Sequence, residues 1–145
     1  MNKDELKSEM MAKGMSQNFV DTLLDKYSEI SPFSYRSVKS LDKHKYKTAF
    51  GEAYSRNGIY IFYKTKTLDI KYIGEAATEP FSKRWRQHFN RSHGGLLYKK
   101  HNALAILESC DVLILYLEHN LSQARDIHFD EDLLIGTFRP CLNNR

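Results

Sequence analysis

Cysteine is scarce in this chain, and its placement does not suit a metal or disulfide site. The two cysteines, Cys110 and Cys141, lie far apart and form no Cys-x-x-Cys pair. We therefore expect two reduced thiols rather than a disulfide or a zinc site. The sequence also lacks a run of eighteen apolar residues, so it predicts no membrane span. The first six residues lack the apolar segment of a secretion signal. Together these absences predict a cytoplasmic protein.

The charge of the chain is concentrated in its middle. The 145 residues are 41% hydrophobic and 28% charged, which is ordinary for a globular domain and enough to bury a core. The net charge is +4, but residues 31–101 carry fifteen Lys/Arg and five Asp/Glu, whereas residues 1–30 and 102–145 are net acidic. This pattern is typical of a polyanion-binding face beside a metal-binding carboxylate, and equally of a solvated basic surface without a partner.

The distribution of apolar residues predicts an α+β fold, in which a small three-stranded antiparallel sheet is flanked by helices. Residues 58–64 and 70–74 are rich in β-branched and aromatic residues and predict a hairpin. Residues 112–117 are a short apolar run, typical of a strand that is buried on both faces.

Helices are expected on both sides of these strands. Ser16 and Ser82 are the expected N-caps of two of them. Residues 34–50 are polar and basic, and we expect a connecting segment that either contacts nucleic acid or is solvated. The expected helices span residues 3–12, 17–28, 83–91, 96–107 and 122–138. The second carries an apolar stripe that we expect in the core, made of Phe19, Val20, Leu23, Leu24 and Tyr27.

Four residues in and after the hairpin suit phosphodiester chemistry. Tyr60 and Tyr72 lie in Gly58-Ile59-Tyr60 and Tyr72-Ile73-Gly74, so the two phenols can share one site on neighbouring strands. Arg84 and His88 are four residues apart and face the same way on a helix. A guanidinium suits two phosphate oxygens, and an imidazole exchanges protons near neutral pH. The alternative is two structural tyrosines beside a basic surface helix with Trp85 and Phe89 packed inward.

Glu131 is the candidate metal ligand. It belongs to the run Asp130-Glu131-Asp132, and three consecutive acids usually form a solvated face. Its spacing from Ile127 and Leu134, however, places Glu131 on the inward stripe of the last helix. An acid in that position needs a partner, and a hard divalent cation completed by phosphate and water is one candidate.

These motifs, in this order, resemble the signature of the GIY-YIG nuclease family. The resemblance runs from Gly58 to Asn143 and includes the hairpin, the Lys-Arg-Trp-x-x-His-Phe stretch, the glutamate helix and the terminal asparagine. It implies a DNA endonuclease that uses Mg²⁺ or Mn²⁺, in a domain spanning residues 51–145 behind an N-terminal helical extension, residues 1–50. Small stand-alone nucleases with such extensions include restriction enzymes, so restriction is one expected role. Mobile-element and repair nucleases would show the same core.

The resemblance also implies roles for individual residues. Tyr60 would be the water-activating base or its relay, Tyr72 would position water or phosphate, and Arg84 would stabilise the transition state. His88 would assist proton transfer, Glu131 would ligate the metal, and Asn143 would brace the site or contact phosphate. The residues expected to face the DNA backbone are Lys83, Arg86, Arg91, Lys99 and Lys100.

Four further points stay open at this stage. Glu75 stands where the family commonly has a small or basic residue, and it would either disturb phosphate approach or add a metal contact. The histidines outside the motif match no zinc pattern, and we expect His128 among them to be a surface or structural residue. One active site cuts one strand, so cleavage of double-stranded DNA requires a homodimer or two sequential encounters. A non-catalytic nucleic-acid-binding module is the alternative function.

Overall fold

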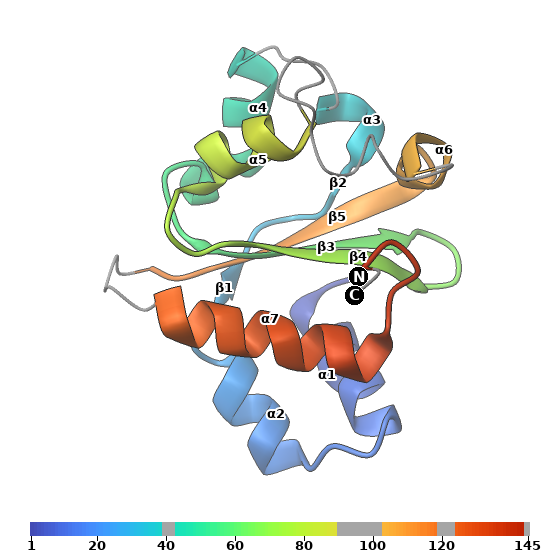
Figure 1. Cartoon of the computed structure of the whole chain (residues 1–145). Helices are drawn as coiled ribbons and strands as arrows, with labels where there is room; N and C mark the ends of the chain where they lie inside the picture. Colours follow the sequence, from blue (N-terminus) through green and yellow to red (C-terminus); the bar gives the residue numbers. More distant parts are fainter. Residues whose placement is uncertain (39–42, 90–102, 119–123, 144–145) are drawn as a thin grey trace.

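The computed structural model describes residues 1–38, 43–89, 103–118 and 124–143, and its centre is an antiparallel sheet (Figure 1). Three seven-residue strands form the body of the sheet, as predicted. Two strands of two residues each, which the sequence pattern does not reveal, pair with β5, and the main order is β1-β5-β3-β4. The strands are β1 (Ser28–Glu29), β2 (Phe33–Ser34), β3 (Gly58–Lys64), β4 (Ile70–Ala76) and β5 (Cys110–Tyr116).

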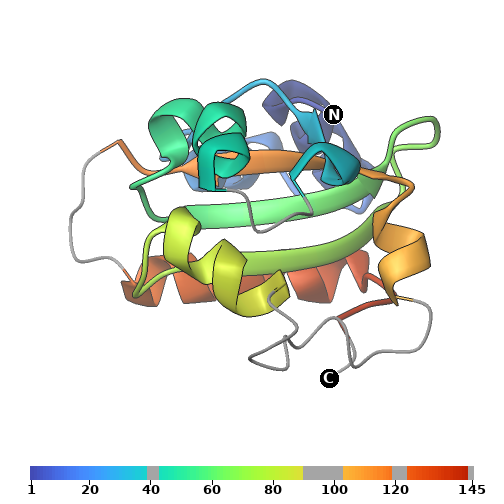
Figure 2. The same ribbon diagram turned by 90° about the horizontal axis from the view of Figure 1, so that it is seen from above.

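Helices cover both faces of the sheet, so that side chains alternate between two cores (Figures 1 and 2). Tyr60 and Phe62 of β3 point into one core with Trp85, whereas Ile59 and Ile61 point into the other. On the first face lie α3 (Tyr35–Val38), α4 (Lys43–Phe50) and α5 (Phe81–Phe89). On the second lie α1 (Lys3–Ala12), α2 (Gln17–Leu24) and α7 (Ala124–Phe138), while α6 (Ala103–Leu107) leads into β5. In the described ranges, no helix has the length and apolar character needed to cross a bilayer.

The polar segment before the hairpin is not a plain connection, which corrects the sequence prediction. Residues 34–50 contain all of α3 and α4, and a 3₁₀ turn, η1 (Gly51–Ala53), follows. Phe50 is fully buried, stacked on Phe81 with ring centroids 5.8 Å apart and edge-on to Trp85 at 5.2 Å. These aromatic contacts with α5 stabilise a helix whose composition alone is polar.

Several predicted boundaries also shift. The second helix ends at Leu24 rather than at residue 28, because Ser28 pairs with Tyr116 of β5. Ser82 is not an N-cap, since α5 already begins at Phe81 and the Arg84 amide donates to the carbonyl of Pro80. Phe19 is 43% exposed and lies outside the core, whereas the rest of its stripe is buried. The predicted start of the helix over residues 96–107 lies outside the described residues.

Residues 1–50 pack closely against the remainder of the chain. Leu6 and Leu24 share the second core with Ile61 and Leu134. Asp130 of α7 is 2% exposed, and one oxygen of its carboxylate accepts from the Tyr27 hydroxyl at 2.6 Å and the Lys26 ammonium at 2.7 Å. The division after residue 50 stays a prediction, but α7 is held from the N-terminal side.

Replacing Tyr27 by Phe is expected to lower the free energy of unfolding by about 1.5–3 kcal/mol, because a buried carboxylate loses a hydrogen-bond donor. Lys26→Met should cost less, about 1 kcal/mol or below, since that side chain is 38% exposed. Urea unfolding of both variants measures the difference. A Tyr27→Phe protein as stable as the parent would contradict the assigned contact.

Candidate active site

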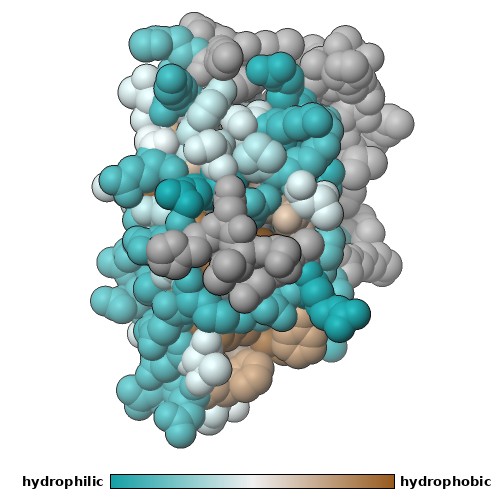
Figure 3. Space-filling view, turned by 90° about the vertical axis from the view of Figure 1, so that its left-hand side faces the viewer, coloured by the Kyte–Doolittle hydropathy of each residue, from teal (hydrophilic) through white to brown (hydrophobic). Residues whose placement is uncertain are grey.

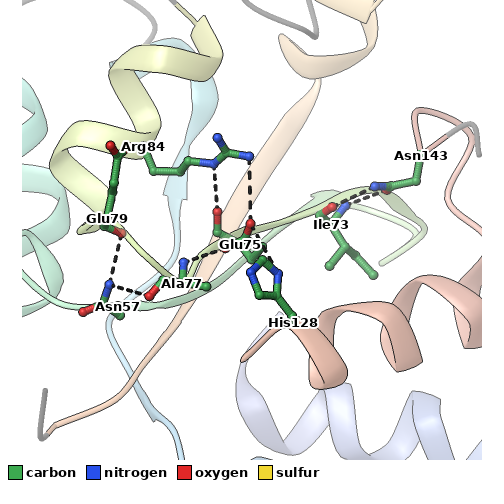
Figure 4. Close-up of polar contacts among 8 residues, drawn as sticks. All are labelled: Asn57, Ile73, Glu75, Ala77, Glu79, Arg84, His128 and Asn143. Atoms are coloured by element: carbon green, nitrogen blue, oxygen red, sulfur yellow. Dashed lines mark hydrogen bonds and ion pairs between the residues drawn. The ribbon is translucent and has the colours of Figure 1, made fainter. Parts of the chain in front are cut away.

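The outer edge of β4 gathers most of the predicted site residues. β4 pairs with β3 on one side only, and its free backbone groups at alternate positions are bound by residues from elsewhere in the chain. The Lys71 carbonyl accepts from the Leu142 amide at 3.1 Å. Asn143 bonds both backbone groups of Ile73, and the Arg84 Nε donates to the Glu75 carbonyl at 3.1 Å. Figure 4 shows the contacts of Asn143 and Arg84 along the strand.

The two tyrosines lie on one face of the sheet, but they are not directly opposite each other. Tyr60 pairs with Gly74, and Phe62 pairs with Tyr72, so the two phenols are diagonal neighbours with ring centroids 6.1 Å apart. Tyr60 is fully buried, and Tyr72 is 8% exposed. The predicted sharing of one site is consistent with this geometry.

Gly74 makes room for the ring of Tyr60. A Cβ atom at residue 74 would lie 2.2 Å from the Tyr60 Cζ and 2.4 Å from its hydroxyl oxygen. The absence of a side chain at residue 74 therefore leaves the space that the Tyr60 ring occupies. Gly58 has a comparable role against β5, where a Cβ would lie 1.9 Å from the Leu115 carbonyl oxygen.

Burial and nearby charge keep both phenols protonated. Burial, followed by the charges of Glu131 and Glu75, raises the pKa of Tyr72 to about 12, although Arg84 and a hydrogen bond with Tyr60 oppose the shift. Burial, and then interaction with Tyr72, Glu131 and Glu75, raises the pKa of Tyr60 well above its ordinary value, again against Arg84. Neither hydroxyl is therefore ionised at neutral pH.

Glu131 acts electrostatically on both phenols. Its helix, α7, covers the face opposite the tyrosines (Figure 1), yet α7 packs chiefly along β4, the edge strand. From there the charge of the Glu131 carboxylate contributes to the raised pKa of both hydroxyls, which puts it within electrostatic reach of the phenols. Glu131 is 8% exposed, which confirms its predicted inward position.

The two acids that flank Glu131 on α7 differ in exposure, so the acidic run is not a uniformly solvated face. Asp130 is buried against Lys26 and Tyr27, as described above, and only Asp132 is exposed. Within the described ranges, no group of three or more His, Cys, Asp or Glu side chains is arranged to hold a metal ion. A cation at this edge would thus have Glu131 as its protein ligand, with oxygens of phosphate and water completing the shell, which suits a hard divalent ion.

The Arg84 side chain is held at the site through its Nε atom. Trp85 beside it is 1% exposed and packs edge-on against Tyr60 at 5.9 Å, which confirms the predicted inward anchor and turns Arg84 toward the sheet edge. Because its Nε bonds the Glu75 carbonyl, the terminal Nη groups are the ones placed to meet a substrate. The nearest of them is 3.9 Å from the Glu75 carboxylate.

Two roles were predicted for Asn143, bracing the site or contacting phosphate, and its contacts are those of a brace. Its Oδ1 accepts from the Ile73 amide at 2.8 Å, and its Nδ2 donates to the Ile73 carbonyl at 2.7 Å. The side chain thus pairs with β4 as a neighbouring strand would, at the residue between Tyr72 and Gly74. This contact holds the two positions that determine where the phenols lie.

Other predicted residues are placed only in part. The backbone of His88 lies in α5, but its side chain is outside the described atoms, as are Arg91, Lys99 and Lys100. Lys83 and Arg86 are exposed on α5, and Lys83 pairs with Glu79 at 3.3 Å. A cavity of about 560 Å³ lies elsewhere, lined by Glu52, Ser55, Arg56, Tyr116 and Glu118, and none of the predicted site residues lines it.

His128 lies next to the predicted site residues, a position that the sequence did not predict. Its Nδ1 is 3.7 Å from the Glu75 carboxylate, and its side chain is half exposed. The surface location that we expected is correct, but the imidazole lies beside the site (Figure 4). The available signal was the spacing of three residues between His128 and Glu131, which places both on one face of α7.

Comparison with known proteins gives one structural likeness. No protein-family model matches the chain, and no curated protein matches it. Among solved structures, the chain is similar to the GIY-YIG N-terminal endonuclease domain of UvrC from Thermotoga maritima, a point mutant bound to its catalytic divalent cation. The two share 27% sequence identity over 70% of this chain and 97% of that chain, with a TM-score of 0.47.

Proposed function

We propose that this chain is an endonuclease that hydrolyses phosphodiester bonds in DNA with a divalent cation. The observation that carries the proposal is the convergence on β4: Arg84 binds its outer edge, and the charge of Glu131 reaches both phenols. Phosphodiester hydrolysis requires activation of water and stabilisation of the charge that develops on phosphorus oxygens. A guanidinium, a carboxylate and two phenols around one point can supply these needs.

The chain's own groups divide the work in a definite way. Because both phenols are protonated at neutral pH, we assign them the positioning of the attacking water, rather than the role of a preformed base; the proton that this water loses passes to solvent. Tyr72, the more exposed of the two, meets the water, and the Tyr60 ring packs beside it with centroids 6.1 Å apart. Arg84 binds the phosphoryl oxygens through its Nη groups and offsets their growing charge.

Glu131 would hold the cation, and Mg²⁺ or Mn²⁺ suits a site with one protein carboxylate. When bound, such a cation stabilises charge on the scissile phosphate and on the leaving oxygen. The exposed Lys83 and Arg86 of α5 would bind the DNA backbone beside the site. We further propose double-stranded DNA as the substrate and restriction as the biological role, with a homodimer cutting the two strands.

Plasmid cleavage tests the proposal directly. The parent protein should nick or linearise supercoiled DNA with Mg²⁺ or Mn²⁺, and chelation should abolish the reaction. Arg84→Ala should slow cleavage about 10²–10³-fold, the cost of losing one donor to the developing charge. The matched control is Arg36→Ala, whose arginine is exposed on α3 and pairs with Glu108 at 3.8 Å, and it should cut at the parental rate. Salt-sensitive DNA binding without cleavage under any divalent ion would instead identify a binding module.

A further inference from the structure

The carboxylate of Glu75 lies between the two helices that carry the proposed catalytic groups (Figure 4). Its side chain is only 14% exposed. One oxygen accepts from the Ala77 amide at 2.5 Å, which turns the side chain back along β4. The other is 3.7 Å from Nδ1 of His128 on α7 and 3.9 Å from an Nη of Arg84 on α5. A shielded acid with a guanidinium on one side and an imidazole on the other is held in a single place.

These distances leave the partners of Glu75 able to bind something else. Separations of 3.7 and 3.9 Å are within ion-pair range but beyond a direct hydrogen bond, so the carboxylate attracts both groups without saturating their donors. Arg84 is fixed mainly by the backbone carbonyl of Glu75. In His128, Nδ1 faces Glu75, so that Nε2, on the far side of the ring, is turned away from the carboxylate in a side chain that is 50% exposed.

We infer that His128 is a further phosphate-contacting residue of the active site, and that Glu75 positions it. The inference rests on the proposed nuclease function. His128 and Glu131 lie on one face of α7, and His128 and Arg84 approach the same carboxylate from opposite helices. A phosphodiester bound by Arg84 at this edge next meets the Nε2 of His128, which donates a hydrogen bond to it when the imidazole carries both protons. Glu75 is a positioning residue in this arrangement, because it orients the ring and need not touch the substrate.

Steady-state cleavage of a duplex substrate by His128→Gln, Glu75→Gln and the double variant tests the inference. His128→Gln should lower kcat/KM about 10–100-fold, as expected for a lost hydrogen bond to a charged group. Glu75→Gln should lower it about tenfold. The double variant should be no slower than His128→Gln alone, because a residue that acts through another adds nothing once that residue is gone. Asp126→Asn, an exposed neighbour on α7, is the control and should match the parent.

Two further readouts separate the possible failures. The Mg²⁺ concentration for half-maximal rate should be unchanged in Glu75→Gln, and an increase would make Glu75 a cation ligand and overturn its positioning role. Fully multiplicative effects of the two substitutions would overturn it as well. If the parent cuts DNA and His128→Gln cuts equally well, this inference fails while the proposed function stands. If the parent shows no divalent-dependent cleavage, both fail. Thermal melting of each variant checks that it is folded. If Glu75→Gln melts at a lower temperature than the parent protein, the result for His128→Gln decides the inference, because that side chain is half exposed.

Discussion

Replacing Glu131 by Gln is expected to reduce DNA cleavage by about 1000-fold or more, corresponding to ~4 kcal/mol of lost transition-state stabilisation. The amide keeps the size and buried position of the side chain, which is 8% exposed, but it removes the charge that we assign to cation binding. Single-turnover cleavage at saturating Mg²⁺ measures the loss. A second effect follows from the same charge: because Glu131 raises the pKa of Tyr72, that pKa should fall from its value of about 12 in the variant.

Asp132→Asn is the matched control for this prediction. The two acids are adjacent on α7, but Asp132 is exposed, so its neutralisation should change the cleavage rate by less than about threefold at a surface position. Calorimetric titration with Mn²⁺ in the presence of uncleavable duplex should show binding to the control and weakened binding to Glu131→Gln. Equal cleavage by the two variants would remove Glu131 from the catalytic assignment.

Replacing Gly74 by Ala is expected to damage both the fold and the activity. The new Cβ would overlap the ring of Tyr60, which is enclosed by Phe62, Phe81 and Trp85 with centroids 5.7–6.4 Å away. Overpacking of this kind costs about 1–3 kcal/mol of stability. The displaced phenol should also slow cleavage about 100-fold, since misplacement by 1 Å has such effects. Urea unfolding and plasmid cleavage measure the two losses.

Gly136→Ala is the control for this prediction, and we expect it to raise the stability of the protein. Gly136 lies within α7, where an added Cβ meets no atom within 4 Å, so alanine should stabilise the helix by about 0.5–1 kcal/mol.

Combining Gly74→Ala with Tyr60→Leu should recover part of the lost stability, because the shorter side chain vacates the contact, but it should not recover activity. Normal stability and cleavage in Gly74→Ala alone would show that the Tyr60 ring is not fixed as described.

Sequence patterns predicted the strongly periodic parts of the fold and failed where contacts between distant segments decide. β3 has its predicted bounds because its residues favour a pleated, buried surface. The polar composition of α4 concealed a helix that depends on Phe50 packing against α5. β1 and β2 have two residues each, which is too short for any periodicity to appear.

The same division applies to the candidate site. The motifs identified Tyr60, Tyr72, Arg84 and Glu131, but they could not show that Gly74 is the partner of Tyr60, because register depends on the pairing of whole strands. The contacts of His128 and Asp130 could not be read from the sequence, because their partners lie 53 and more than 100 residues away in the chain. Glu75 stands where the family commonly has a small or basic residue, and in the structure its carboxylate contacts Arg84 and His128.

On the face seen in Figure 3, apolar surface gathers mainly in the lower part of the view. Among the described residues, the exposed large apolar side chains are Met11, Phe19 and Phe129. Hydrophobic patches of limited size are normal on folded proteins and carry no functional argument by themselves.

The way in which Asn143 and Arg84 cover β4 has a consequence for handling the protein. A bare sheet margin is a template for intermolecular β-pairing, and natural proteins block such margins. Here the blocking groups are themselves members of the proposed catalytic set. Truncating either side chain therefore uncovers amides and carbonyls that invite self-association into aggregates. Light scattering should accompany every rate measurement on such variants, because precipitation and lost chemistry would otherwise look alike.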